Sequence, residues 1–439
     1  MFAPTTYQLR RQRLADALSD GLILLPANEE AAMNCQSNVY PFRQDSNFRY
    51  FAGYNLPDLV LTIDPADGEC RLFGNDFTLD DIVWMGAQPD VRDLARDQGM
   101  QYGGSLADVG AYVKKFATVH YLPAYREHRR QQLRGWVGHG DRPSDELIRA
   151  VVALRSVKSR EEVVALDQAV FTSMQMHGAA RDTARPGMTE AAVAGLIEGI
   201  AISAGGRLAY PAIVTRNGHI LHNHYHGNEL RRGDLLLVDA GAEAATGYAG
   251  DITRTFAVGA ALDARQQAVY DTVQRAKTQS IAAVRPGVPY REVHDLSARV
   301  ITEGLQEMGL MKGDPGEAVA AGAHALFYPH GLGHMLGLDV HDMEDLGEDF
   351  VGYDDEIRRS EQFGTRNLRL GKRLREGFVL TVEPGCYFIP QLIDQWEAEG
   401  QHRDFIDYAA VKAFRNFGGI RLEDNVVVQA DNCRVLGTV

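Results

Sequence analysis

The chain has 439 residues, and at roughly 100–200 residues per domain this length predicts two or three domains. Apolar residues make up 45% and charged residues 24%, which is typical of globular proteins and excludes a mainly disordered, collagen-like or coiled-coil chain. The 45 basic and 59 acidic side chains leave a formal net charge of −14. Because so acidic a chain has no overall attraction for phosphate backbones or anionic lipid, we expect neither nucleic acid nor a membrane as a partner.

The cysteines and the N-terminal segment bear on the compartment. The four cysteines show no CxxC spacing, which argues against a zinc ribbon or a thioredoxin-type site. Four thiols are too few to cross-link a chain of this length, and this favours a reducing compartment. The first residues lack a basic segment followed by an apolar one, and no apolar run approaches the ~20 residues that span a bilayer. We therefore expect a soluble cytoplasmic protein.

The first 155 residues alternate strand-like and helical segments. An apolar run predicts a buried strand over residues 21–26, and residues 59–64 and 70–73 flank an Asp-Gly turn that predicts a hairpin. Residues 106–116 predict a helix, and residues 118–122 predict a further strand. We therefore expect a small α/β domain with a mixed sheet over residues 1–155.

A domain boundary is predicted near residues 155–160. Ser159 and Glu162 have the spacing of a capping box, which opens a helix. Apolar residues then recur at helical spacing, at Val163, Leu166, Val170 and Met174. The second domain is expected to span residues 160–439.

This second domain contains an internal repeat. An Arg-Pro-Gly turn at residues 185–187 recurs at residues 285–287. Residues 233–241 and 377–385 share the pattern Gly, five residues, acid, one residue, Gly, and in both the acid ends a run of high β-propensity. Each copy is followed by a second acid in an apolar context. The repeat predicts a pseudo-two-fold domain that brings four carboxylates together.

The four carboxylates belong to Asp239, Asp251, Glu383 and Glu423. Carboxylates are rarely buried unless they are paired or bound to a metal. Four of them at one place would repel one another strongly, so the repeat predicts cations between them. The alternative is that each acid ends its own strand or forms a separate salt bridge.

Histidines support the metal hypothesis. His330 and His334 are four residues apart, but the intervening glycines and the preceding proline favour an extended segment over a zincin-like helix. The glycine spacing also differs from a dinucleotide fingerprint. One histidine with several carboxylate oxygens is a hard-donor site that suits Mn²⁺, Co²⁺ or Fe²⁺ better than structural Zn²⁺. With one acid bridging, two ions roughly 3.5–4 Å apart would acidify a shared water, so the pattern predicts metal-assisted hydrolysis.

Taken together, these motifs resemble those of the pita-bread metallopeptidases, a family that includes methionine aminopeptidase, aminopeptidase P and prolidase (Xaa-Pro dipeptidase). All five metal-site motifs occur in the family's order, and the resemblance covers most of residues 160–439. The matching segments are residues 238–241, 250–256, 330–334, 382–385 and 419–425.

The resemblance implies a role for each ligand. Asp239 would chelate one metal ion and His334 the other. Asp251 and Glu423 would bridge both ions. Glu383 would bind the second ion and act as general base for the bridging water, so the site is expected to hold two divalent ions per chain. Manganese is the first expectation, and Co, Zn and Fe are the alternatives.

Other histidines match family residues that hold the substrate and stabilise the transition state. His330 and His341 match two of them, and His222 matches a third by its spacing before Asp239. The local sequence around His222 departs from the family pattern, so His224 stays an alternative. The alternative is that this segment is a solvated polar loop without a role in catalysis.

The N-terminal domain narrows the comparison within the family. Residues 41–53 resemble the N-terminal domain of aminopeptidase P and prolidase, which methionine aminopeptidase lacks. Creatinase has a similar two-domain fold without the metal site, and the intact acids argue against that activity. The resemblance thus implies an α/β (α+β) fold, with a creatinase-like N-terminal domain and a pseudo-two-fold pita-bread catalytic domain.

The segment before Glu383 favours the prolidase branch. Residues 367–374 resemble the segment in which a prolidase arginine grips the carboxylate of the C-terminal proline, and Arg369 is the matching residue. A guanidinium suits this because it binds a carboxylate bidentately. Tyr387 and Arg421 are the other expected substrate-binding residues, and the resemblance also implies that Arg421 supports the metal ligands.

The expected activity is therefore hydrolysis of Xaa-Pro dipeptides by a hydroxide that bridges two metal ions, in a homodimeric enzyme. The alternative within the family is an aminopeptidase P that removes the first residue from Xaa-Pro-Yaa peptides. The alternative from another class is a non-catalytic binding protein on the same fold. A phosphotriesterase side activity is compatible with the same site.

Overall fold

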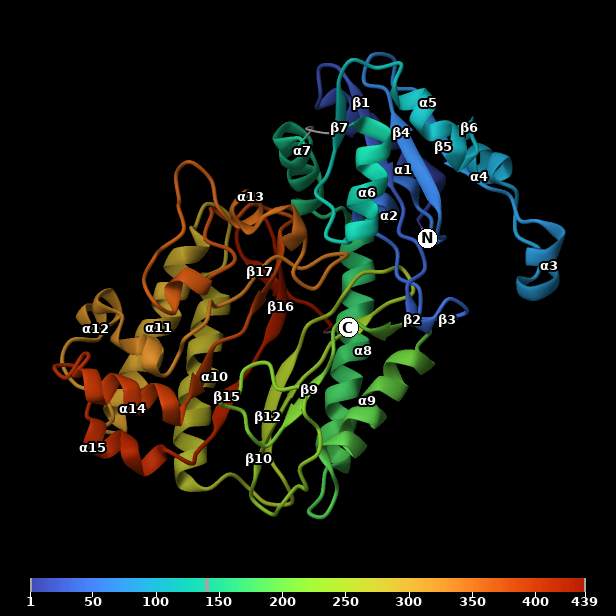
Figure 1. The fold of residues 1–439 in the computed structure, drawn as a ribbon. Coiled ribbons are helices and arrows are strands. Elements are labelled where there is room, and N and C mark those ends of the chain that lie inside the picture. The colour runs from blue at the N-terminus through green and yellow to red at the C-terminus, as the bar shows by residue number, and fades with distance from the viewer. Residues whose placement is uncertain (1, 139–141, 438–439) are drawn as a thin grey trace. The chain divides into compact units, whose positions relative to one another are not determined.

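The structure is a computed structural model that describes residues 2–138 and 142–437. The chain divides into two compact units (Figure 1). The first contains the residues up to Arg155 together with Asp345–Phe350, and the second contains Ser156–Glu344 and the residues from Val351 onward. The short segment Asp345–Phe350 thus clusters with the first unit although it lies far along the chain.

The first unit is built on a five-stranded mixed sheet. The central strands β1, β4 and β5 are antiparallel neighbours, and the edge strands β6 and β7 add in parallel. The predicted hairpin and both predicted single strands are present, and the mixed sheet confirms the expected fold class. The strands are β1 (Leu22–Pro26), β4 (Leu59–Ile63), β5 (Cys70–Gly74), β6 (Gln101–Gly104) and β7 (Val119–Tyr121), with the separate hairpin β2 (Ala32–Cys35) and β3 (Asn38–Val39).

The helices of the first unit are short. The helix predicted for residues 106–116 is only partly formed: a 3₁₀ turn, η1 (Leu106–Asp108), leads into α5 (Val109–Val113). The capping box of Ser105 and Asp108 starts this segment, and the chain must leave it early to enter β7. The other helices are α1 (Pro4–Asp16), α2 (Ser46–Ala52), α3 (Leu79–Met85), α4 (Val91–Asp97), α6 (Glu127–Val137) and α7 (Asp145–Ser156).

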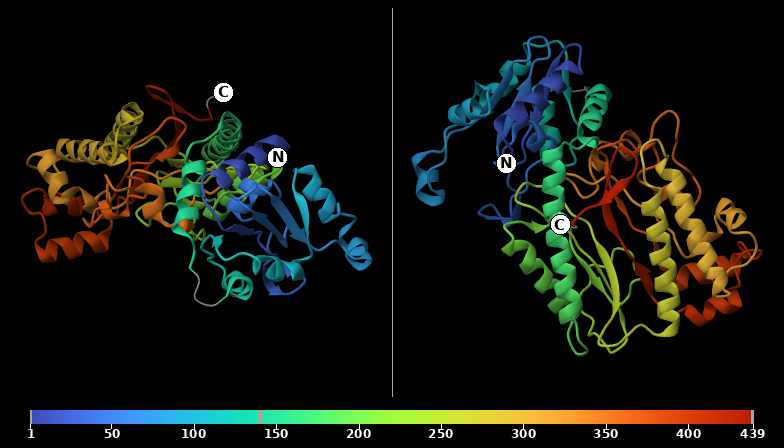
Figure 2. Two further views of the ribbon diagram at one scale, coloured as in Figure 1. Left: turned by 90° about the horizontal axis from the view of Figure 1, so that it is seen from above. Right: turned by 180° about the vertical axis from the view of Figure 1, so that it is seen from behind.

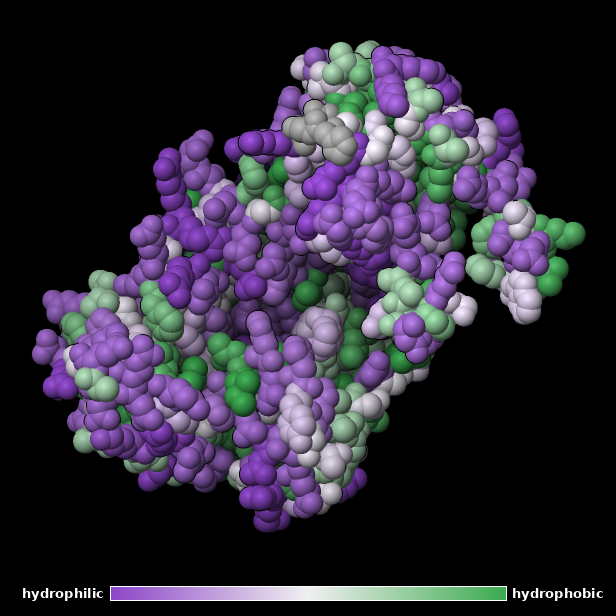
Figure 3. Space-filling model, in the orientation of Figure 1, coloured by the Kyte–Doolittle hydropathy of each residue, from purple (hydrophilic) through white to green (hydrophobic). Residues whose placement is uncertain are grey.

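Helix α3 differs from the others because its apolar side chains face solvent. Trp84 is 81% exposed and Leu79 is 79% exposed. The space-filling view shows hydrophobic atoms gathered on this helix (Figure 3). A capping box of Thr78 with Asp81 satisfies the backbone at the start of this helix.

The second unit repeats one helix–turn–helix arrangement. The long helices α8 (Arg160–Thr183) and α9 (Glu190–Ser203) form the first pair, and α10 (Ala264–Ala283) and α11 (Tyr290–Glu307) form the second. Each Arg-Pro-Gly turn ends with a glycine at positive φ, +89° at Gly187 and +83° at Gly287, which a side chain would strain. Seen from behind, both pairs lie in front of the strands (Figure 2).

Helix α8 begins as expected, and most of its predicted apolar face is buried. Ser159 and Glu162 form the predicted capping box. Leu166 and Val170 are fully buried, whereas Met174 is 37% exposed. Ala169, beside Val170, is buried as well, and Gly250 approaches its backbone closely.

The strands of the second unit repeat as well. In the first half β10 lies between β9 and β12, and in the second half β16 lies between β13 and β17, all antiparallel. The repeat confirms the predicted pseudo-two-fold architecture. The strands are β8 (Arg207–Leu208), β9 (Ile213–Thr215), β10 (Leu235–Asp239), β11 (Ala242–Glu243), β12 (Thr253–Ala257), β13 (Val379–Val382), β14 (Gly385–Tyr387), β15 (Gly419–Arg421), β16 (Asp424–Val428) and β17 (Cys433–Val435).

Polar contacts join the two halves at their centre. The Asn425 side chain accepts a hydrogen bond from the backbone of Asp251 and donates one back to its carbonyl. The backbone N–H of Glu423 donates to the carbonyl of Thr253. These bonds fix the second strand of each half against the other. The remaining helices of this unit lie toward the second half: α12 (Pro315–Ala321), α13 (Glu348–Gly352), which begins in the first unit, α14 (Pro390–Glu399) and α15 (Tyr408–Val411).

Within the described part of the chain, no helix combines the length and apolarity that crossing a membrane would require.

Candidate metal centre

The four repeated acids lie where strands end or begin. Asp239 is the last residue of β10 and is opposite Thr253, while Asp251 lies just before β12. In the second half, Glu383 directly follows β13, and Glu423 lies between β15 and β16. Matching strand ends in the two halves therefore present matching carboxylates, as the repeat predicts.

His334 is placed beside these acids by an extended segment that pairs with β13. The carbonyls of His334 and Leu332 accept hydrogen bonds from the N–H groups of Thr381 and Glu383. This confirms the extended rather than helical conformation expected from the glycines. Gly333 is required here, since a side chain at this position would collide with the carbonyl of Thr381.

The predicted ligands converge. The Nε2 atom of His334 lies 3.4 Å from Asp251 Oδ2 and 3.6 Å from Glu383 Oε1. Ligand atoms of Asp251, His334 and Glu423 all lie within 4.8 Å of one another. The fifth residue, Asp239, joins the cluster through a shared contact with Asp251, described below.

The electrostatics of this cluster fit bound cations. Burial raises the pKa of Glu383 to about 8, and the neighbouring carboxylate of Asp251 adds to the shift. Burial and the same carboxylate also raise the pKa of Glu423 well above its ordinary value. Oε1 of Glu423 is buried and has no hydrogen-bond partner among the described residues. Buried acids that repel each other, with an unsatisfied oxygen between them, are what divalent cations would stabilise.

Tyr210 is part of the cluster, and no sequence motif pointed to it. Its hydroxyl lies 2.6 Å from Asp239 Oδ1 and also contacts Asp251 Oδ1. Burial, together with these two carboxylates, raises the pKa of Tyr210 well above its ordinary value, so it stays protonated. One hydroxyl proton serves two acids, and Tyr210 thereby links the two ligands of the first half.

Each nitrogen of the Arg421 guanidinium contacts a protein group. Its Nη2 lies 2.5 Å from Asp239 Oδ2, its Nη1 donates to the hydroxyl of Tyr387 at 3.0 Å, and its Nε donates to Thr253 at 3.3 Å. Burial opposes its charge, yet Tyr387 and Asp239 raise the pKa of Arg421 above its ordinary value. This geometry favours the supporting role expected for Arg421 over direct contact with substrate.

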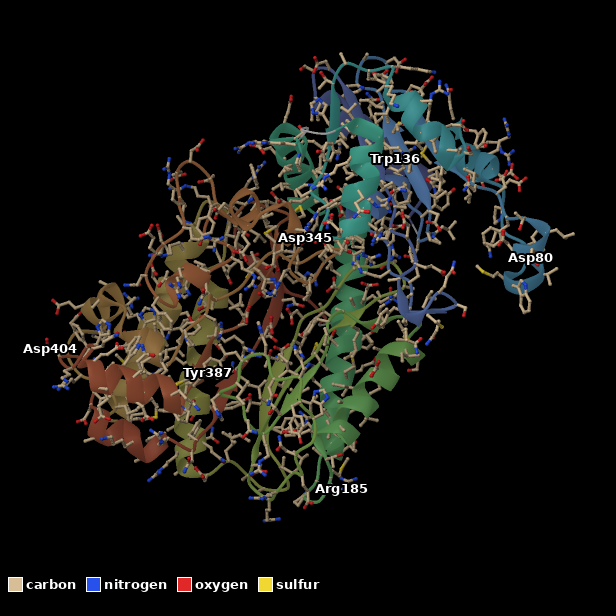
Figure 4. All side chains as sticks on the ribbon, in the orientation of Figure 1. Asp80, Trp136, Arg185, Asp345, Tyr387 and Asp404 are labelled. Carbon is tan, nitrogen blue, oxygen red and sulfur yellow. The ribbon has the colours of Figure 1, made fainter. Side chains whose placement is uncertain are left out.

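Tyr387 continues this chain of contacts to His330. Tyr387 lies on β14, is fully buried, and is labelled in Figure 4. Its oxygen is 2.8 Å from Nε2 of His330, whose Nδ1 is 2.8 Å from the carbonyl of Gly331. Since a carbonyl only accepts, Nδ1 carries the proton and Nε2 accepts from Tyr387. Burial, aided by the charge of Arg421, lowers the pKa of His330 to about 3, so the ring is neutral.

His341, Glu344 and Arg369 form a second polar group beside the cluster. The ring of His341 lies edge-on to that of His334, with centroids 4.3 Å apart. Its Nδ1 is 2.6 Å from Glu344 Oε2, and Oε1 of Glu344 lies 3.3 Å from Nη2 of Arg369. The hydrogen bond to His341 lowers the pKa of Glu344 to about 2, so the carboxylate is ionised. Sequence reasoning missed Glu344: its contact with His341 is local, three residues away, but its contact with Arg369, 25 residues further on, depends on tertiary packing.

Among the histidines of this loop, His222 is under the electrostatic influence of the site. Partial desolvation and the charge of Arg421 lower its pKa, and Asp239 acts on it in the opposite direction. His226, in the same loop, contacts the carbonyl of Ala212, at 3.1 Å. The choice of His222 over His224 stays a prediction.

Comparison with known proteins identifies the class. Residues 164–430 match the profile of metallopeptidase family M24, and residues 7–121 match the N-terminal domain of aminopeptidase P. The chain belongs to metallopeptidase family M24, and it is an enzyme of that family.

Its relatives include two kinds of peptidase. A human Xaa-Pro dipeptidase is 30% identical, covering 99% of this chain and 90% of its own length. An Escherichia coli Xaa-Pro aminopeptidase is 32% identical, covering 96% and 92%. Among solved structures, aminopeptidase P from E. coli with the inhibitor Pro-Leu superposes with a TM-score of 0.82 at 30% identity, covering 100% of this chain and 95% of that chain. The fold is thus shared along the whole chain.

Proposed function

We propose that this chain hydrolyses the Xaa-Pro bond of dipeptides, using two divalent cations held by Asp239, Asp251, His334, Glu383 and Glu423. The convergence of these five side chains, with the buried unsatisfied oxygen of Glu423 among them, carries the proposal. Manganese is the first candidate, with Co, Zn and Fe as alternatives, and a zinc-substituted form is known for the E. coli relative. Such a pair of cations supplies the positive charge that makes a shared water nucleophilic near neutral pH.

The chain's own residues hold these ligands in place. Asp251 and Glu423 come from opposite halves and lie at the centre, which suits a bridging role. Asp239 is held by Arg421 and Tyr210. Nδ1 of His334 lies 3.0 Å from the carbonyl of Met335, so the proton resides on Nδ1 and the lone pair of Nε2 faces the acids.

Glu383 is proposed as the general base. Its side chain is 19% exposed, against 13% for Asp239 and 8% for Asp251, so it is the most accessible of the three carboxylates. It accepts the proton of the attacking water as the oxygen–carbon bond forms. It then returns the proton to the prolyl nitrogen as the carbon–nitrogen bond breaks, which gives a free amino acid and proline.

Recognition of proline requires contacts other than an amide N–H, because the Xaa-Pro bond has none. Arg369 is proposed to recognise the C-terminal carboxylate of a dipeptide through its guanidinium. The guanidinium contacts Glu344, and Glu344 in turn contacts His341. The alternative, an aminopeptidase P activity, is supported by the same contact, since a guanidinium already paired with Glu344 attracts a substrate carboxylate less strongly.

Substrate length separates the two activities. Metal-reconstituted enzyme is given Gly-Pro-type dipeptides and matched Xaa-Pro-Yaa tripeptides, and kcat/KM is compared. A dipeptidase prefers the dipeptides by at least about tenfold, the scale of one charge-assisted contact. Equal or faster cleavage of the tripeptides would establish the aminopeptidase activity instead, and cleavage of neither would contradict the proposed Xaa-Pro specificity.

A further inference from the structure

One carboxylate contacts both the proposed carboxylate-binding arginine and a proposed catalytic histidine. Glu344 opens the short 3₁₀ turn η3 (Glu344–Leu346). Its Oε2 takes the hydrogen bond of His341 Nδ1 at 2.6 Å. Its Oε1 accepts from Nη2 and Nε of Arg369, at 3.3 and 3.4 Å. The two oxygens therefore serve different partners.

The contact with Oε2 of Glu344 fixes the tautomer and the ring orientation of His341. Because an ionised carboxylate can only accept, Nδ1 of His341 carries the proton. The other ring nitrogen is then the one available for the reaction, and the ring is held against His334. Carboxylates that hold histidines in this way set their tautomer and orientation.

The second contact weakens the positive charge of Arg369. A guanidinium and a carboxylate together carry no net charge, so the pair attracts a further carboxylate less than the arginine would by itself. Both donors of Arg369 approach the same oxygen at more than 3.2 Å, whereas a bidentate pair has two parallel bonds of ~2.7–2.9 Å. The pair is also about one-third exposed, at 32% for Arg369 and 38% for Glu344. So loose a pair can admit a competing carboxylate.

We propose that Glu344 determines how strongly this site prefers a free C-terminal carboxylate, because it positions His341 with one oxygen and offsets the charge of Arg369 with the other. This inference rests on the proposed function and deepens it. Glu344 is a positioning and specificity-determining residue, and it makes the preference for dipeptides over longer peptides weaker than Arg369 alone would.

The test replaces the charge of Glu344 while keeping a hydrogen-bond acceptor, as Glu344→Gln does. Binding of proline and of prolinamide to the metal-loaded enzyme is measured by calorimetry, since the two ligands differ only in the carboxylate. Proline should bind about 5–20-fold more tightly to the variant, and prolinamide should bind unchanged. The kcat values for dipeptides and for dipeptide amides should fall by one common factor.

Two further variants guard against a purely structural effect. Glu344→Asp keeps the charge, so its ratio of proline to prolinamide affinity should stay near that of the wild type even where kcat falls. Glu356→Gln is the matched control, because Glu356 pairs with Arg373 on the exposed surface nearby, and it should alter neither ratio nor kcat.

Dependence on Arg369 completes the test. In an Arg369→Ala background, Glu344→Gln should leave the proline-to-prolinamide ratio unchanged. An unchanged or lower ratio in Glu344→Gln itself, in an enzyme that cleaves Xaa-Pro bonds, would overturn the inference. Failure of the wild type to cleave any Xaa-Pro peptide would instead overturn the proposed function.

Discussion

The two halves of the second unit share a scaffold but differ in what they add to it. The first half supplies Asp239 and Asp251, and the second supplies Glu383 and Glu423, from equivalent strand ends. The connection between the second helix of each pair and the first acidic strand is unequal. It runs over residues 204–234 in the first half and over residues 308–378, more than twice the length, in the second.

The longer connection carries most of the groups proposed to handle the substrate. His330, His341 and Arg369 all lie in it, together with Glu344 and the metal-site histidine. The shorter one carries Tyr210 and His222. The repeat therefore supplies the metal ligands from equivalent positions in both halves. The longer connection of the second half supplies most of the residues proposed to bind the substrate.

The largest expected effect follows from the shared centre. Chelation should abolish hydrolysis, and Mn²⁺ or Co²⁺ should restore it. Asp251→Asn and Glu423→Gln should each give near-complete loss of activity and lower the metal content at both positions, because each residue is proposed to bridge. Metal content is measured by atomic emission beside kcat/KM. Asp234→Asn, which removes an acid paired with Arg216 outside the centre, is the control and should retain its metal.

Loss of only one of the two ions in Asp251→Asn or Glu423→Gln would break the symmetric part of this comparison. Full activity in the metal-free protein would contradict the metal-dependent mechanism altogether.

The second prediction distinguishes Glu383 from its symmetric counterpart. Glu383→Gln should lower kcat by ~10²–10⁴, the scale of general-base catalysis, beyond any loss of metal. Asp239→Asn should act mainly through metal affinity, because Arg421 and Tyr210 hold its oxygens. Comparing kcat at equal metal occupancy tests this, and near-normal turnover in a fully loaded Glu383→Gln enzyme would remove the proposed role.

The repeat and the acids could be predicted because they leave a pattern in the sequence. An acid at the end of each apolar run marks a strand terminus, and two copies at matching spacing indicate two-fold packing. Tyr210 and Glu344 leave no such pattern. The carboxylates that Tyr210 contacts and the arginine that Glu344 contacts are distant in sequence and are reached only through tertiary packing, as is the grouping of Asp345–Phe350 with the first unit.

Helix faces were predictable only in part. Met174 has the spacing of a core residue on α8, yet it is 37% exposed, whereas Leu166 and Val170 of the same series are fully buried. Spacing predicts an apolar face, but the elements packed against the helix decide how far along the helix that face is covered. Likewise, the sequence could not reveal that each nitrogen of the Arg421 guanidinium contacts a protein group, in Thr253, Tyr387 and Asp239.

The third prediction tests the proposed substrate recognition by the longer connection, which the first half lacks. Arg369→Ala should weaken dipeptide cleavage by ~1.5–3 kcal/mol, the scale of a hydrogen bond to a charged group, or about 10–150-fold in kcat/KM. Arg369→Lys should recover part of this, since an ammonium cannot form the paired contact. Dipeptide amides should be insensitive to either change. A silent Arg369→Ala, with tripeptides cleaved as fast as dipeptides, would assign recognition elsewhere and favour the aminopeptidase.

The smallest effect on activity, and a measurable one on stability, is expected at a buried histidine of the longer connection. His324 is 1% exposed and lies 6.4 Å, centroid to centroid, from the fully buried His294. Neither ring nitrogen of His324 has a hydrogen-bond partner among the described residues. Burial lowers the pKa of His324 to about 4, whereas an unfolded histidine has a pKa near 6.5.

The sign of the pH effect follows from that depression. Between pH ~6.5 and about 4, His324 is protonated in the unfolded chain but neutral in the folded protein. The contribution of His324 to stability is therefore present above pH ~6.5 and is lost as the pH falls toward about 4. A shift of this size is worth about 3 kcal/mol at full effect.

His324→Leu removes the proton-binding group and should make the free energy of unfolding depend less on pH between pH 6.5 and 4. This is measured by urea titration of the wild type and the variant. If His324→Leu keeps the wild-type slope, the acid sensitivity resides in other groups. His177 of the first half would be the next to test, since burial lowers its pKa to about 4 as well. His294 of α11 and His330 of the longer connection are two other histidines whose pKa values are lowered by burial, and they would be tested beside it.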